Sequence, residues 1–303
     1  MSIPMQIGFT LPQMGALANE AARAARFAAE AERLGADSLW VGDRMLAPVN
    51  PSVGYMGGDG IPEVFHSVLD PFALMSAAAA VTERVRIGSN VLNAPWYPPA
   101  LLARSLTTID QISGGRLIAG FGTGWSPEEY QAAGVPMPQR GARLDECLDV
   151  LFSWWSENPV EHHGEHWSVP ASRVNVKSVQ RPRPPVHLAA FSPAALRRVA
   201  RRADGWLPVH VPGASGFDPA ALNGTMAEIR RHAAEAGRDP AELGAVLRIN
   251  PVSPENLDET VETIKRAQAE TEIDHVFVEL MNLAKDVDQA LEFAEQVLRL
   301  ARG

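Results

Sequence analysis

The chain has 303 residues, of which 46% are hydrophobic and 21% charged, the composition of a globular protein with a large core. Its net charge is −9 and its Lys and Arg residues form no cluster on one predicted face, so we expect no nucleic-acid partner. The single cysteine, Cys147, excludes an intramolecular disulfide framework and a cysteine-based zinc site.

The N-terminal segment and the apolar runs predict a cytoplasmic protein without a membrane span. Residues 1–10 lack a basic stretch followed by a long apolar core, so no secretory signal is expected. The run from Ala77 to Val81 is too short to cross a bilayer, and it ends at charged residues.

Short β-like runs alternate with amphipathic helical stretches along almost the whole chain. The predicted strands are Gln6–Leu11, Ser38–Gly42, Val85–Ser89, Arg116–Phe121, Val186–Ala190, Gly205–Val209, Val246–Asn250 and His275–Leu280. The predicted helices are Asn19–Leu34, Asp70–Val81, Pro99–Ile112, Arg140–Trp155, Pro193–Arg202, Pro219–Ala236, Leu257–Glu270 and Val287–Ala301. Eight strands that are each followed by a helix predict an α/β protein with a closed (β/α)8 barrel, and an open doubly wound sheet is the alternative.

Two long segments interrupt this rhythm. The first, residues 44–69, is rich in Gly and Pro and follows the second strand, so we expect it to cover the mouth of the barrel. The second, about 157–185, separates the fourth helix from the fifth strand and contains five prolines with β-prone pieces around Trp167. We interpret it as an insertion with a hairpin inside a single domain that spans residues 1–303.

Two motif-like patterns in the chain fail on their structural context. His162, Glu165 and His166 fit the spacing H-x-x-E-H, but that zinc motif needs a helix, and Gly164 with the nearby prolines favours a hairpin. We therefore predict no metal site. The glycines at 120, 122 and 124 do not complete a dinucleotide fingerprint, because the third glycine would have to stand at Trp125.

The end of the fourth strand is the most informative part of the sequence. The strand 116–121 opens into the loop Gly122-Thr123-Gly124 and then into a helix that starts after Pro127, with Glu128 and Glu129 in its first turn. Such an arrangement brings backbone N–H groups close to a cofactor. The alternative is an ordinary loop with small residues for packing. We interpret the two glutamates as residues that are favourable at a helix start.

Four segments together resemble the luciferase-like monooxygenase superfamily, and within it the oxidoreductases that use the deazaflavin coenzyme F420. These segments are Ala36–Asp43, Arg86–Leu92, Gly115–Leu117 through Gly124-Trp125, and Arg181–Val186 leading to Ala203–Trp206. The resemblance covers about residues 5–210. From Asn250 onwards only the alternation of strands and helices continues.

The resemblance implies a cofactor site at the barrel mouth. It places a cis peptide bond between Asn90 and Val91 beneath the cofactor ring, Asn93 near the ring edge, and the Gly122-Thr123-Gly124 loop against the cofactor. It places Ala190-Phe191-Ser192 at the cofactor phosphate. Independently of the family, Ser192 is a good helix N-cap followed by Pro193, and free N–H groups at a helix start hold anions. A capped helix without a ligand is the alternative.

Candidate catalytic residues follow the second and sixth strands. Asp43-Arg44 stands where the family often has Asp-His, and an arginine stays protonated, so Arg44 is suited to anion binding or ring stacking. The alternative is an Asp43 N-cap with Arg44 in a surface ion pair. His66 and His210 are the histidines predicted on the active face, and each is otherwise a solvated loop side chain.

The expected function is hydride transfer between coenzyme F420 and a small-molecule substrate. Phe65, Trp96, Tyr97 and Trp125 predict an apolar or aromatic substrate pocket. The sugar-phosphate branch of the family relies on lysines, whereas this chain has only Lys177, Lys265 and Lys285. Two alternatives are an FMN-dependent monooxygenase that uses reduced flavin and O2, and a non-catalytic flavin- or deazaflavin-binding protein. The family also implies a homodimer.

Overall fold

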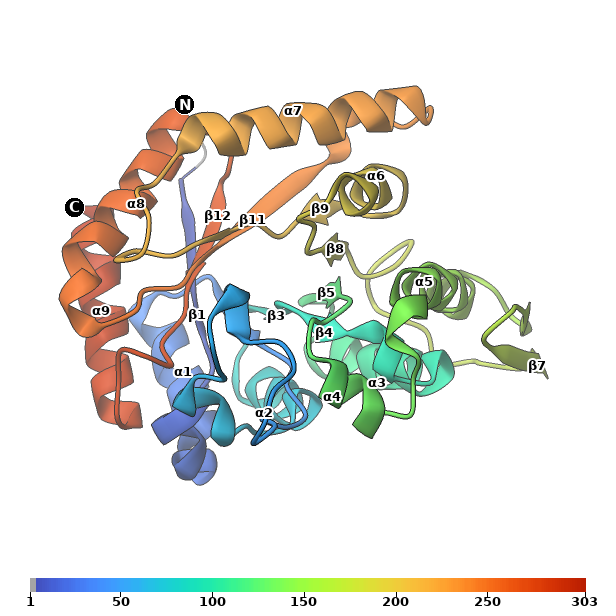
Figure 1. Cartoon of the computed structure of the whole chain (residues 1–303), viewed down its shortest axis with the longest axis horizontal. Helices are drawn as coiled ribbons and strands as arrows, with labels where there is room; N and C mark the ends of the chain where they lie inside the picture. Colours follow the sequence, from blue (N-terminus) through green and yellow to red (C-terminus); the bar gives the residue numbers. More distant parts are fainter. Residues whose placement is uncertain (1–3) are drawn as a thin grey trace.

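Strands and helices alternate in the order that the sequence predicts (Figure 1). The computed structural model describes residues 4–303, apart from the side chain of Met56. Its barrel strands are β1 (Gln6–Thr10), β2 (Ser38–Val41), β3 (Arg86–Ser89), β5 (Leu117–Gly122), β8 (Val186–Leu188), β9 (Gly205–Trp206), β11 (Gly244–Ile249) and β12 (His275–Val278). Two short strands, β4 (Leu92–Asn93) and β10 (Val209–His210), extend the ladder beyond β3 and β9.

The strands close into a barrel. Each of the eight barrel strands pairs in parallel with both of its neighbours. The circle is complete because β1 pairs with β12 as well as with β2. This pairing confirms the predicted (β/α)8 barrel and excludes the open sheet. It also brings the carboxyl ends of all the strands to one face.

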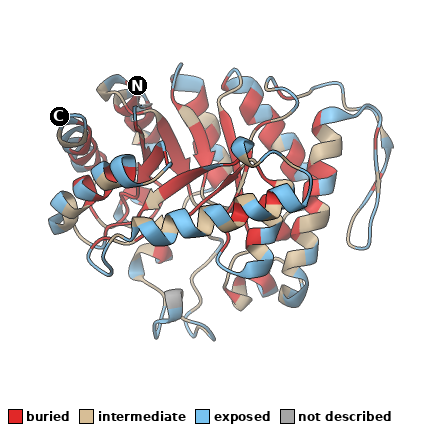
Figure 2. Cartoon of the chain, turned by 90° about the horizontal axis from the view of Figure 1, so that it is seen from above, coloured by how far each residue is buried: buried red, intermediate tan, exposed pale blue. Residues whose placement is uncertain are grey.

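Helices surround the barrel (Figure 2). The α-helices are α1 (Ala24–Leu34), α2 (Pro71–Val81), α3 (Pro99–Ile112), α4 (Pro127–Ala132), α5 (Arg140–Ser156), α6 (Pro193–Arg202), α7 (Pro219–Glu235), α8 (Leu257–Glu270) and α9 (Val287–Arg302). The 3-10 helices are η1 (Gly15–Arg23), η2 (Tyr55–Gly57), η3 (Glu63–His66), η4 (Ala94–Trp96), η5 (Met137–Gln139), η6 (Pro240–Glu242) and η7 (Pro254–Asn256). Within residues 4–303, none of the helices is both long and apolar enough to cross a membrane.

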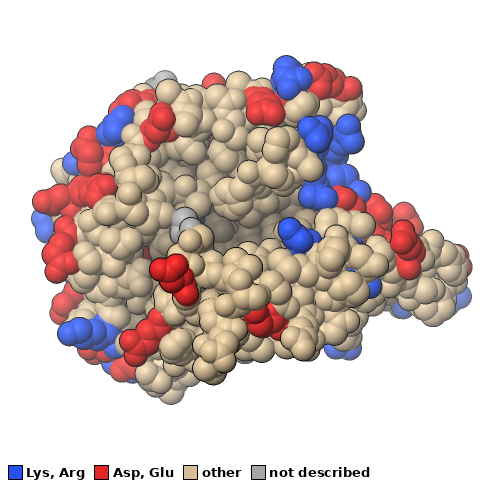
Figure 3. Space-filling model, in the orientation of Figure 1, with Lys and Arg blue, Asp and Glu red and all other residues tan. Residues whose placement is uncertain are grey.

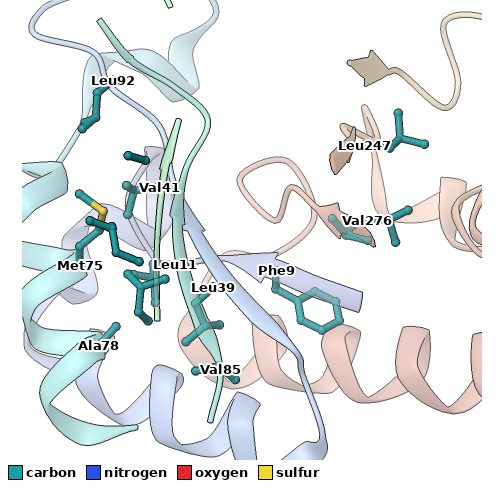
Figure 4. Packing of buried hydrophobic residues seen from close by; sticks show 14 of the residues in the cluster. Phe9, Leu11, Leu39, Val41, Met75, Ala78, Val85, Leu92, Leu247 and Val276 are labelled. Carbon is teal, nitrogen blue, oxygen red and sulfur yellow. The ribbon is translucent and has the colours of Figure 1, made fainter. Parts of the chain in front are cut away.

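Two layers of apolar side chains hold the fold together. Between strands and helices, Met75 of α2 packs beside Leu11 and Val41 (Figure 4). Inside the barrel, the Trp40 ring stacks on Phe277 with centroids 4.6 Å apart. A Cβ atom at Gly88 would lie 2.4 Å from the Trp40 ring, so only glycine leaves room for this indole. The packed lumen forms a floor beneath the barrel mouth.

The insertion contains the predicted hairpin. Its strands β6 (Val160–His163) and β7 (Ser168–Ser172) pair antiparallel and project away from the barrel (Figure 1). Glu146 of α5 anchors the turn by accepting backbone N–H groups from His166 at 2.9 Å and Trp167 at 2.7 Å. Within the described part of the chain, no three His, Cys, Asp or Glu side chains converge as a metal site.

Candidate active site

A cavity of about 570 Å³ opens at the carboxyl ends of the strands. The same face is hollowed at its centre in the space-filling view, with mostly uncharged atoms around the opening (Figure 3). The predicted site residues that line the cavity are Asp43, Arg44, Phe65, Asn90, Val91, Asn93, Gly122, Thr123, Gly124, Trp125 and Phe191. A volume of this size suits a cofactor or a small organic molecule.

Other predicted residues lie outside the lining of this cavity. His66 is exposed on η3, and His210 is buried with its ring edge-on to Phe217 at 5.2 Å. Ser192 is exposed at the start of α6. Three more residues support the lining from behind: Tyr97 contacts Asp43, Trp96 lies under Gly124, and the carbonyl of Ala190 accepts a hydrogen bond from Trp206.

Asp43 is held by a small hydrogen-bond network at the end of β2. Its Oδ2 atom accepts a hydrogen bond from the Asn93 backbone N–H at 2.8 Å and one from the Tyr97 hydroxyl at 2.9 Å. The Asn93 side chain donates to the Asp43 carbonyl at 3.0 Å. Burial raises the pKa of Asp43 to about 6, although both bonds to the carboxylate act in the opposite direction. The carboxyl can therefore exchange a proton near neutral pH.

Arg44 is clamped between two aromatic rings. Its guanidinium lies 4.9 Å from the Phe65 ring centroid and 4.6 Å from that of Trp125, distances typical of cation–π contacts. Nη2 lies 3.4 Å from Oε2 of Glu129, and both side chains are more than nine-tenths buried. Instead of the surface ion pair considered from the sequence, Arg44 forms a buried one.

The two adjacent glutamates of α4 hold the 44–69 loop over the cavity. Glu129 accepts the backbone N–H of Met45 at 2.7 Å. Glu128 accepts both the N–H and the hydroxyl of Ser52, at 2.8 and 2.6 Å. These bonds from Ser52 lower the pKa of Glu128 to about 2, so the tether stays ionised at physiological pH. Tyr55 extends the apolar cover by packing on Phe65 and Trp125.

The loops after β3 and β5 meet at the bottom of the cavity. The Asn90–Val91 peptide bond is cis, as the family resemblance implies. A Cβ atom at Gly122 would lie 2.5 Å from Val91, and one at Gly124 would lie 3.0 Å from Oδ1 of Asn93. Gly124 also has a φ of +65°, a backbone conformation that residues with a side chain rarely adopt. The glycines are therefore needed for the close approach of these loops.

The helix α6 begins close to the cavity, directly after the lining residue Phe191. The Ser192 hydroxyl caps the helix by accepting the Ala195 N–H at 3.4 Å, and Pro193 stands at the first helical position. Phe191, one residue earlier, lines the cavity with 74% of its surface exposed. The start of α6 is thus capped and exposed, and it lies one residue beyond the cavity lining.

Sequence reasoning missed one charged wall of the cavity. Arg248 of β11 lines it and donates from Nη2 to Oε2 of Glu279 at 2.7 Å. Arg248 and Glu279 are each the charged member of an otherwise apolar run of the sequence. This pattern is the signal that could have indicated a role for the two residues. Met14, Val53, Tyr55, Leu207 and Val209 are further lining residues that carry no such signal.

Comparison with known proteins identifies the family. The family model for luciferase-like monooxygenases matches residues 2–302. An uncharacterized protein of Mycobacterium tuberculosis H37Rv is 33% identical over 220 residues, which is 71% of this chain and 73% of that protein. A phthiodiolone/phenolphthiodiolone dimycocerosates ketoreductase of M. tuberculosis H37Ra is 28% identical over 244 residues, covering 78% of this chain and 62% of the ketoreductase.

Solved structures share the fold at lower identity. Monooxygenase RslO1 from Streptomyces bottropensis superposes with a TM-score of 0.77 at 21% identity, covering 97% of this chain and 99% of RslO1. An F420-dependent secondary alcohol dehydrogenase bound to an F420–acetone adduct gives a TM-score of 0.70 at 19% identity, covering 99% and 100%. With a family match along nearly its whole length, the chain belongs to the luciferase-like monooxygenase family, whose members are oxidoreductases.

Proposed function

We propose that this protein transfers a hydride between coenzyme F420 and a small apolar or aromatic substrate. One observation carries the proposal: a carboxyl group with a pKa near 6, Asp43, lines an apolar cavity together with the residues that the family resemblance assigns to the cofactor ring. A proton-exchanging group beside a hydride-transfer cofactor supplies both parts of a carbonyl reduction or of its reverse.

The residues present fit a deazaflavin. Asn90 Nδ2 is buried without a hydrogen-bond partner among residues 4–303, and Asn90 lines the cavity, so a bound ring with polar edges would satisfy it. Val91 and the Gly122–Gly124 loop would support the ring, and the accessible start of α6 at Ser192 would hold the phosphate. When bound, the coenzyme supplies the hydride or accepts it.

Asp43 is our candidate for the proton-transferring group. Reduction of a carbonyl places a hydride on carbon and a proton on oxygen, and a carboxylic acid with a pKa near 6 can donate that proton. We prefer it to His66 and His210, because neither histidine lines the cavity. A relative that is 28% identical is named a ketoreductase, which fits this type of reaction.

The cavity walls favour an apolar or aromatic substrate. Tyr55, Phe65 and Trp125 form an aromatic cover, and the charge of Arg44 is balanced by Glu129. The three lysines of the chain are outside the cavity lining, and Lys177 donates to carbonyls at the base of the insertion. A sugar phosphate would need cations with unbalanced charge, whereas both arginines of the lining, Arg44 and Arg248, are paired with glutamates.

The second candidate is an FMN-dependent monooxygenase. The tethered loop and its aromatic residues enclose the cavity, and exclusion of water protects reactive species in oxygen chemistry. The proposal also includes a homodimer, which the family implies, and a cytoplasmic location, which the sequence predicts.

Cofactor binding separates these functions. We expect F420 to quench protein fluorescence on binding with a much lower Kd than FMN, and the loaded protein to oxidise or reduce members of a panel of aromatic and aliphatic alcohols and ketones. Tight FMN binding with weak F420 binding would instead favour the monooxygenase. Tight binding without turnover of any panel member would indicate a non-catalytic binding protein. Sedimentation of the purified protein tests the dimer.

A further inference from the structure

The guanidinium of Arg248 is fixed in place on the cavity wall. Its Nη2 atom donates to Oε2 of Glu279 at 2.7 Å, and the other carboxylate oxygen of Glu279 accepts the Thr10 hydroxyl at 2.8 Å. The same hydroxyl accepts the backbone N–H of Leu280 at 2.9 Å. This chain of bonds runs from β11 through the residues that follow β12 to β1, and it orients the arginine from behind.

Arg248 retains donors that the protein does not use. Its Nε atom is buried and has no hydrogen-bond partner among residues 4–303. The side chain keeps only 17% of its surface exposed, yet it lines the cavity. An unpaired buried donor is costly, so such a group in a cavity points to a ligand acceptor. Because Glu279 balances the charge, a delocalised monoanion suits it better than a phosphate.

Arg248 lines the same cavity as the residues proposed to support the cofactor ring. Arg248 is the second-last residue of β11 and pairs with Val209 in the barrel ladder. Asn90 follows directly after β3, on another part of the same rim, and both residues line the cavity. The aromatic cover around Tyr55, in contrast, comes from the loop above. A ring resting on Asn90 and Val91 would thus extend toward Arg248.

We propose that Arg248 binds the pyrimidine edge of the deazaflavin ring and selectively stabilises the reduced, anionic form of the ring. This inference rests on the proposed function. Reduction places negative charge on N1 and the C2 carbonyl oxygen of this edge. The Nε–H of Arg248, which has no acceptor among residues 4–303, would donate a charge-assisted hydrogen bond to one of these acceptors. Positive charge near the ring nitrogens is a means by which proteins tune such cofactors.

The test compares affinity for the two redox states. Because R248M alone would leave Glu279 buried and unpaired, the main variant is R248M/E279Q, in which the introduced amide oxygen can still accept the Thr10 hydroxyl. E279Q alone, which keeps Arg248, is the matched control, and R299M removes an exposed arginine of α9 outside the cavity. Urea unfolding verifies that each variant is folded. Dissociation constants for oxidised and reduced F420 are measured by fluorescence quenching, without any substrate.

We expect R248M/E279Q to lose about tenfold more affinity for reduced than for oxidised F420, the size of a lost charge-assisted hydrogen bond. That ratio corresponds to a midpoint potential about 30 mV more negative for this two-electron couple. E279Q should keep or increase the preference for reduced F420, because it removes the negative charge that balances Arg248, and R299M should keep the wild-type ratio. Equal losses of affinity for both redox states in R248M/E279Q, or no loss for either, would overturn the proposal. Failure of the wild-type protein to bind F420 at all would instead refute the proposed function.

Discussion

The Tyr97 hydroxyl donates a hydrogen bond to Oδ2 of Asp43 over 2.9 Å, behind the wall of the cavity. The Asn93 N–H donates to the same oxygen, and both bonds favour the ionised carboxylate. Burial nevertheless has the larger effect and raises the pKa of Asp43 to about 6. The opposition between burial and these bonds is what places the carboxyl in a useful range for proton transfer.

The substitution Asp43→Asn tests this balance through stability. A carboxyl whose pKa rises from 3.8 in the unfolded chain to about 6 on folding stabilises the native state below pH 4, and this contribution disappears as the pH rises to 6. Asparagine does not titrate, and its amide oxygen can accept both hydrogen bonds. We expect the unfolding free energy of the variant to match that of the wild type near pH 4 and to exceed it at pH 7.5, by about 3 kcal/mol.

Urea unfolding at the two pH values measures this difference, with Asp218→Asn at an exposed N-cap as the control. The same Asp43→Asn variant should lose at least about 100-fold in turnover, because it cannot donate a proton at that position. A stability difference between Asp43→Asn and the wild type that is independent of pH would contradict the raised pKa.

Replacing Tyr97 by Phe should move the pH profile. The hydroxyl lowers the pKa of Asp43, so its loss raises that pKa further above 6. If protonated Asp43 is the active form, kcat/KM falls as the pH rises through its pKa, and in the variant this fall occurs at higher pH. Phe72→Leu, at the ring that packs edge-on to Tyr97 at 5.4 Å, is the matched control for packing. If the pH dependence of kcat/KM were the same in Tyr97→Phe and in the wild type, Asp43 would not be the proton-transferring group.

A comparison of alanine variants at two glycines with similar backbone conformations tests whether the loop after β5 contacts the cofactor. Gly124 and Gly134 have φ values of +65° and +70°, so alanine at either position costs about 1 kcal/mol in backbone strain. Only at Gly124 does the added Cβ meet a neighbour, Oδ1 of Asn93 at 3.0 Å, while Gly134 has open space. We expect Gly124→Ala to weaken cofactor binding about tenfold, measured by fluorescence quenching. Equal cofactor affinities of the two variants would show that the loop does not contact the cofactor.

The alternation of apolar runs and amphipathic stretches was sufficient to predict the barrel, because each element carries its own period. The predicted strand Gly205–Val209 shows the limit. It is divided into β9 and β10 at Pro208, which has no N–H for the ladder, although its carbonyl still accepts from Arg248. The prediction treated this proline as an ordinary strand residue.

For the site, residues next to strand ends were found because the topology alone brings them to one face. Glu129 was interpreted only as a helix-start residue, since its contact with Met45 spans 84 positions along the chain. No local pattern encodes such a contact. Similarly, the exposure of His66 depends on how the 44–69 loop folds as 3-10 turns, which composition does not specify.

The tether between Glu128 and Ser52 predicts how the loop opens. Glu128→Ala removes two hydrogen bonds to a carboxylate, each stabilising the closed loop by about 1.5 kcal/mol or more. Chymotrypsin should therefore cleave at Tyr55 or Phe65 at least about tenfold faster than in the wild type, because local opening exposes these sites. Glu165→Ala, at an exposed position of the insertion, is the control. Unchanged cleavage would mean that the aromatic contacts alone hold the loop.

The buried ion pair of Arg44 and Glu129 should contribute to the stability of the fold. Arg44→Met leaves the Glu129 carboxylate buried without its partner, which costs about 3–5 kcal/mol of unfolding free energy. In the double variant with Glu129→Gln, the amide oxygen still accepts the Met45 N–H and no charge is left unpaired. Most of the lost stability should therefore return.

Urea unfolding of the two single variants and the double variant gives the coupling energy between these residues. Arg33→Met, at an exposed pair with Glu30, should leave unfolding unchanged and serves as the control. Additive effects of the two substitutions would mean that the aromatic rings, and not Glu129, hold the guanidinium. In that case the charge of Arg44 would be available to a substrate anion, and the preference for apolar substrates would have to be abandoned.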